Sequence, residues 1–124
     1  MTSIRRRARW LSALLVATVL IAGCAQAGPP AGAIKVTMSD YKFAPANLSA
    51  KAGKVDFYLT NTGTQAHDML IADPSGKVLA ASGLVQASND STFSISNLPP
   101  GTYQIYCDVP GHRALGMEGT LTVT

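Results

Sequence analysis

The stretch KVDFYLTN, residues 54–61, alternates apolar and polar side chains along its whole length. Its apolar members occupy every second position: Val55, Phe57 and Leu59. Successive side chains of a β-strand point to opposite faces, so a period of two places these three on one face. The stretch therefore predicts a strand with one face against a core and the other near water.

Further short runs extend this pattern from residue 34 to the end of the chain, with turn residues between them. They are IKVTMS (34–39), NLSAKAG (47–53), HDMLIAD (67–73), KVLAAS (77–82), STFSISNL (91–98), TYQIYC (102–107) and GTLTVT (119–124). We expect 77–82 to be a weak edge strand and Met38 and Met69 to lie in the core. Short, evenly spaced strands without a helical period predict an all-β Greek-key sandwich of two sheets and roughly 7–8 strands.

The N-terminal segment has the order of an export signal. Four arginines in residues 5–9 precede an apolar stretch, residues 10–21, and then small residues. This order is typical of a secretory signal peptide, and the stretch is shorter than the roughly 20 residues of a permanent span. Ile21-Ala22-Gly23-Cys24 resembles the lipobox of bacterial lipoproteins, which implies that Cys24 carries lipid. An ordinary signal cut near residues 25–27 and an uncleaved anchor are the alternatives.

These features divide the chain into three parts. Residues 1–23 are the predicted signal peptide, residues 24–33 a tether rich in Pro and Gly, and residues 34–124 one folded domain. The whole chain has 10 Lys and Arg against 7 Asp and Glu, but four of these arginines precede residue 24. Six minus seven leaves the exported part with a charge of about −1, which argues against nucleic acid as a partner.

The stretch YCDVPGHRALGM, residues 106–117, places three metal-binding side chains five residues apart: Cys107, His112 and Met117. The only other cysteine is Cys24, so Cys107 is a lone thiol if Cys24 is lipidated; a disulfide between them is the alternative. Thiolate and thioether are soft ligands, and together with imidazole they select copper. The recurring copper site of this kind has two histidines, and the one other histidine is His67.

Two segments together resemble the cupredoxins, the blue copper proteins. LPPGTYQIYCDVPGHRALGM (98–117) is similar to their ligand loop, with a spacing most similar to rusticyanin and auracyanin, and NTGTQAHDM (61–69) to the segment of their first histidine. The resemblance implies one type 1 copper ion, with His67, Cys107 and His112 as strong ligands and Met117 as a weak axial ligand. Asp68 stands where many cupredoxins have Asn, which puts the usual clamp between the ligand loops in question. We expect the Asp68 backbone N–H to reach the Cys107 sulfur and its carboxylate to make the reduction potential depend on pH.

A metal held by four protein ligands has no open position for substrate, so we expect a one-electron carrier and not an enzyme. Electrons would pass through His112 at an apolar patch of Pro110, Ala114 and Leu115, where redox partner proteins would dock. The expected location is the outer face of a bacterial membrane, or the periplasm, with the chain a monomer held by lipid. A copper storage or delivery lipoprotein is the main alternative; a metal-free β-sandwich and a thiol hydrolase are further ones.

Overall fold

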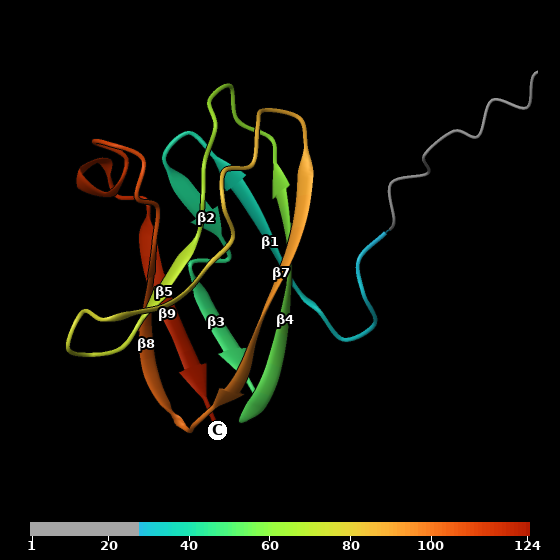
Figure 1. The fold of residues 1–124 in the computed structure, drawn as a ribbon. Helices are drawn as coiled ribbons and strands as arrows, with labels where there is room; N and C mark the ends of the chain where they lie inside the picture. The colour runs from blue at the N-terminus through green and yellow to red at the C-terminus, as the bar shows by residue number, and fades with distance from the viewer. Residues whose placement is uncertain (1–27) are drawn as a thin grey trace, which may run out of the picture.

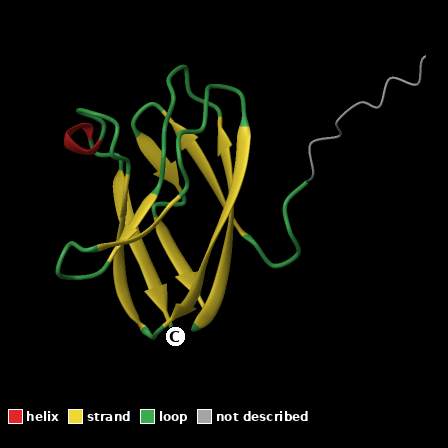
Figure 2. Cartoon of the chain, viewed as in Figure 1, coloured by secondary structure: helices red, strands yellow, loops and turns green. Residues whose placement is uncertain are grey.

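The computed structural model describes residues 28–124. The predicted signal peptide, Cys24 and the first residues of the tether lie outside these residues. The described part contains β-strands and one short 3-10 helix (Figures 1 and 2). The strands are β1 (Ile34–Ser39), β2 (Lys42–Ala44), β3 (Asn47–Ala50), β4 (Gly53–Asn61), β5 (Leu70–Ala72), β6 (Val78–Ala81), β7 (Asp90–Leu98), β8 (Gly101–Tyr106) and β9 (Glu118–Val123), and the helix η1 is Arg113–Leu115.

The strands form the two sheets of a sandwich, which confirms the predicted fold class. One sheet has the order β2-β1-β4-β7 and the other β3-β9-β8-β5-β6. Strands distant in sequence are neighbours in both sheets: β1 pairs with β4 and β3 with β9 in parallel, while the remaining pairs are antiparallel. These pairings bring the end of β1, the start of β5, the end of β8 and the start of β9 to one end of the sandwich (Figure 1).

The core lies between the two sheets and contains the inward side chains that the alternation predicts. Val55, Phe57 and Leu59 of β4 are buried, and Phe57 stacks on the opposite Phe93 of β7 with ring centroids 4.8 Å apart. Stacked rings at this distance add to the burial of their apolar area. Met38 and Met69 also lie in the core, both with no exposed surface, as expected.

The observed strands differ from the expected ones in three places. β2 is an additional strand, so the described residues hold nine; its three residues are too few to show an alternation, and it forms because the chain turns back onto β1. β3 ends at Ala50, because its partner strand β9 ends at the paired residue Val123. β5 is shorter than HDMLIAD, because His67 pairs in an isolated bridge with Val85 instead. β6 is an edge strand, as predicted.

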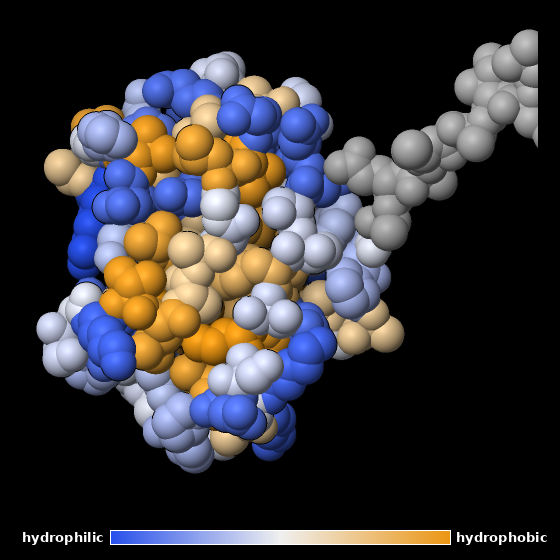
Figure 3. Space-filling model, in the orientation of Figure 1, coloured by the Kyte–Doolittle hydropathy of each residue, from blue (hydrophilic) through white to orange (hydrophobic). Residues whose placement is uncertain are grey.

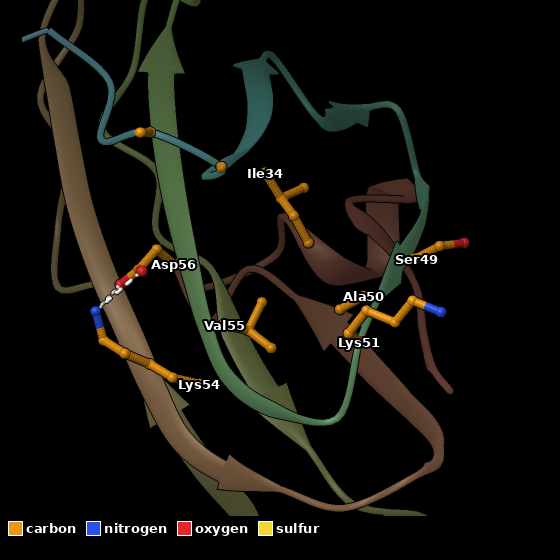
Figure 4. A pocket seen from close by; sticks show the side chains of 9 residues that line it. Ile34, Ser49, Ala50, Lys51, Lys54, Val55 and Asp56 are labelled. Carbon is orange, nitrogen blue, oxygen red and sulfur yellow. Dashed lines mark hydrogen bonds and ion pairs between the residues drawn. The ribbon is translucent and has the colours of Figure 1, made fainter.

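Among residues 28–124, no helix has the length and apolar character that a membrane crossing requires. Apolar residues gather down the middle of the face seen in Figure 3. A depression lined by Ile34, Ala50, Val55 and the Lys54–Asp56 ion pair (Figure 4) lies near the end of β9, away from the ligand loop. It holds none of the candidate ligands, which lie at the opposite end of the sandwich.

Candidate metal centre

The loop between β8 and β9 carries three of the candidate ligands and is folded upon itself. Its ends are joined by a hydrogen bond from the N–H of Cys107 to the carbonyl of Met117 (3.1 Å). The N–H of Met117 donates to the carbonyl of His112 (3.1 Å), so two backbone hydrogen bonds close the loop. Gly111 and Gly116 have φ of +86° and +101°, a region that only glycine adopts readily. These bonds and bends turn His112 back over the cysteine.

His67 reaches the site from a different loop, which a buried amide holds in place. Backbone N–H and carbonyl groups of His67 and Val85 exchange two hydrogen bonds, of 3.1 and 2.7 Å. The side chain of Asn61 donates to the carbonyls of Gln65 and Val85, each at 2.8 Å, and accepts from the N–H of Gly63 at 2.9 Å. Asn61 is 1% exposed, so these bonds are shielded from water. It thereby fixes the loop that presents His67.

Cys107, His67 and His112 meet in a buried cluster. Nδ1 of His67 lies 3.0 Å from Nδ1 of His112, and the Cys107 sulfur lies 3.6 Å from the same His112 nitrogen. All three ligand atoms lie within 4.8 Å of one another. Met117, which follows in the same loop, is fully buried and belongs to the same core cluster as Cys107. The structure thus brings the two distant ligand segments of the sequence to one point.

The cysteine environment favours a neutral thiol unless a cation is bound. Burial raises the pKa of Cys107 above its ordinary value, although backbone N–H groups of Asp68 and Val109 directed at the sulfur act in the opposite sense. The Asp68 carboxylate accepts the backbone N–H of Asp108 at 2.7 Å. The lowering effect of the Asp68 N–H on the thiol pKa agrees with the expected approach of the Asp68 backbone to the sulfur, and this contact stays a prediction. The two ligand loops are also tied together, with a carboxylate as the acceptor.

The turn between β1 and β2 contributes two residues to the site that the sequence did not reveal. Asp40 Oδ1 lies 3.0 Å from Nε2 of His67, and the ring of Tyr41 meets the ring of His112 edge to face at 4.9 Å. Hydrogen bonds from the hydroxyl and backbone N–H of Thr64, and then from His67, lower the pKa of Asp40 to about 2. Turn residues are common in any sequence, and only the pairing of β1 with β4 brings this turn beside the ligands.

The donor set fits copper better than other metals. A thiolate, two imidazoles and a thioether are ligands that favour copper, and a trigonal arrangement of two histidines and a cysteine with a distant methionine is typical of electron-transfer sites. Two nitrogens 3.0 Å apart and a sulfur 3.6 Å from one of them have the separations expected of atoms sharing one ion. A thiol hydrolase would need an exposed thiolate, whereas Cys107 has no exposed surface.

Comparison with known proteins defines the class to which this fold and site belong. Residues 11–123 match the family model of the cupredoxin-like domain, and the chain belongs to that family. It is 34% identical over 117 residues to a plastocyanin of Prochlorothrix hollandica, covering 89% of this chain and 86% of that one. It is also 37% identical over 67 residues to auracyanin-B of Chloroflexus aurantiacus, a match that spans 52% of this chain and 28% of that protein.

Solved structures show the same fold. The auracyanin B structure superposes with a TM-score of 0.70 at 23% identity, covering 79% of this chain and 92% of that one. Reduced auracyanin from Roseiflexus castenholzii gives 0.69 at 19% identity, covering 78% and 99%. The cofactor of this cupredoxin is one copper ion in a type 1 site, which sets aside the metal-free reading.

Proposed function

We propose that the protein carries single electrons, with His67, Cys107 and His112 as strong copper ligands and Met117 as the axial one. The observation that carries this proposal is the closed, buried cluster of three ligand atoms, all within 4.8 Å of one another. When bound, copper supplies the one-electron Cu(I)/Cu(II) couple. The backbone bonds of both loops hold the ligands in position, and burial of the cluster excludes water and substrate.

Electrons would enter and leave through His112. Within residues 28–124 every buried side-chain nitrogen and oxygen has a hydrogen-bond partner, whereas Nε2 of His112 has none, so this atom must be open to solvent. His67 has no exposed surface. Exposed side chains of Pro110, Ala114 and Leu115 lie in the same loop and would form the small apolar patch on which redox partner proteins dock. Such brief encounters need only a small interface.

The chain would be exported and held by lipid on Cys24 at the outer face of a bacterial membrane. Supporting this location are the order of residues 1–24 and the lipobox resemblance. A tether of residues 24–33 spans at most about 35 Å when extended. It joins the start of β1, which lies beside Phe57 near the middle of β4, whereas the ligand loop lies at the end of the sandwich toward which β1 runs. Cys24→Ser should move the protein from the membrane to the soluble fraction.

Asp68 would tune the reduction potential. Its carboxylate accepts the backbone N–H of Asp108, the residue that follows Cys107, and its negative charge acts on the Cys107 thiol. A proton on that carboxylate would remove a negative charge from the site. We therefore expect the potential to rise as the pH falls. In Asp68→Asn this dependence should be weaker; equal pH profiles of the two proteins would reject the role.

The visible spectrum tests the carrier function. The segment from residue 28 onward holds both sheets and the core, so it can be purified, loaded with Cu(II) and compared with its Cys107→Ser variant. An intense thiolate-to-copper charge-transfer band that bleaches rapidly with a protein reductant supports a carrier, and Cys107→Ser should lack it. Weak colour with readily exchanged Cu(I) would instead indicate copper delivery and would overturn the proposal.

A further inference from the structure

The turn between β1 and β2 touches both histidines of the cluster, although neither of its residues is a ligand. Asp40 bonds to His67 and Tyr41 packs on His112. The same turn is also tied to the loop before His67, because Asp40 accepts the N–H and the hydroxyl of Thr64, at 3.1 and 2.6 Å. A polar side chain with these bonds can set which nitrogen of a histidine carries hydrogen.

The contact determines the hydrogen on His67 by simple elimination. An ionised carboxylate can only accept, so at 3.0 Å the Nε2 of His67 must be the donor. A neutral imidazole has one N–H, so Nδ1 of His67 keeps a free lone pair. Nδ1 of His112 lies 3.0 Å from it. In the metal-free protein the hydrogen between these two atoms therefore belongs to His112.

We propose that Asp40 is a positioning residue of the copper centre: it holds His67 with Nδ1 ready to ligate, and its negative charge favours Cu(II) over Cu(I). This inference rests on the copper site proposed above, but not on the identity of any redox partner. Metal-bound histidines commonly donate their second N–H to an oxygen, and loss of that oxygen commonly costs about 10–100-fold in metal affinity.

Gly63 supplies independent support, because a side chain there would disturb this contact. A β-carbon at position 63 would collide with Asp40 Oδ1 and would lie 3.0 Å from Nε2 of His67. Gly63 has no positive φ that would otherwise require glycine. The small residue is therefore matched to the close approach of Asp40 and His67. Gly63→Ala should displace the contact without removing either polar group.

The first test reads the hydrogens directly and needs no copper. The chain has two histidines, so nitrogen NMR of the metal-free full chain at pH 8 shows both rings, and the Tyr41 contact assigns His112. We expect His67 with hydrogen on Nε2 and His112 with hydrogen on Nδ1. Asp40→Ala and Gly63→Ala should lose this fixed pattern for His67, while Asp40→Asn, whose amide oxygen can still accept, should keep it. An unchanged pattern in Asp40→Ala would overturn the proposal.

The second test separates charge from structure. Asp40→Asn should raise the midpoint potential of the copper-loaded protein, by about 59 mV for each tenfold loss of Cu(II) affinity relative to Cu(I). Asp73→Asn is the matched control, because Asp73 likewise caps a turn, by accepting from Ser75 and Lys77, but contacts neither histidine. Thr64→Val removes one loop bond and leaves the His67 contact.

A potential in Asp40→Asn equal to that of Asp73→Asn would refute the charge effect. An equal rise in Thr64→Val would assign the effect to the loop and not to Asp40. If Asp40→Ala does not fold, Asp40→Asn and Gly63→Ala still decide the outcome. Should the wild-type protein show no blue band, the copper proposal fails, whereas the metal-free NMR pattern still tests the role of Asp40.

Discussion

Asn61 offers a sharp test of how the first histidine is held. Its amide is buried, and its partners, two carbonyls and one N–H, dictate its orientation. Asn61→Ala would remove three hydrogen bonds at once and leave the buried carbonyl of Val85 without this donor. No other described side chain joins the loop before His67 to the segment that pairs with it.

The structure sets the size of the effect. Each bond contributes about 1 kcal/mol net, and the carbonyl of Val85 keeps the N–H of His67 as a partner. Asn61→Ala should therefore lower the free energy of unfolding by about 3 kcal/mol, a large part of the typical 5–15 kcal/mol. Asn61→Asp should cost at least as much, because its oxygens would face two carbonyls.

Urea unfolding of the metal-free protein measures the loss, and copper titration measures its effect on the site. The control is Asn89→Ala, an exposed asparagine with no side-chain hydrogen bond among the described residues, which should stay within about 0.5 kcal/mol of wild type. Copper affinity should fall in Asn61→Ala and not in Asn89→Ala. A loss of less than about 1 kcal/mol at Asn61 would show that the amide does not hold the loop, and the account of His67 placement would be wrong.

Three further predictions concern the strands and the thiol. Gly119→Ala would push a β-carbon into the backbone carbonyl of Ala46, so unfolding should become easier by about 1–3 kcal/mol, whereas Gly28→Ala, in open space, should change nothing in the same urea titration. Cu(II) binding at pH 7 should release about one proton, because burial keeps Cys107 a thiol until the metal binds. Calorimetry in two buffers of different ionisation enthalpy measures the number of protons released. Binding without proton release would contradict the raised pKa of Cys107. The Tyr58 hydroxyl donates to the carboxylate of Asp90, and this bond raises the pKa of Tyr58. The bond therefore stabilises the fold below about pH 10, and its contribution to the free energy of unfolding is lost as the pH rises further. Between about pH 9 and 11, unfolding titrations should show this loss in the wild type and not in Tyr58→Phe.

Much of the fold was visible in the sequence because burial imposes a short period. The alternation in 54–61 and in 102–107 predicted which side chains of β4 and β8 face the core. Cys107 continues the inward series of β8, so its position followed from the same pattern. The sequence analysis did not predict β2, because its three residues form a strand only by pairing with β1.

The residues around the ligands were harder to predict than the ligands. Cys107 and His112 lie five residues apart, and their chemical types are informative in one short segment. Asp40 contacts His67 across 27 positions, and aspartates are frequent in turns whether or not a metal site is near. Asn61 likewise shows its role only through carbonyl groups, which every residue possesses. Such contacts depend on strand register, which no local pattern specifies.

The ligand loop lies between β8 and β9, the last two strands of the sandwich. A ribosome therefore completes eight of the nine described strands before a thiol, an imidazole and a thioether are all available in one segment. Any product of premature termination before residue 107 would lack three of the four metal-binding side chains and would also miss β9, which lies between β3 and β8. All four metal-binding side chains are therefore present only in a chain that already contains eight of the nine described strands.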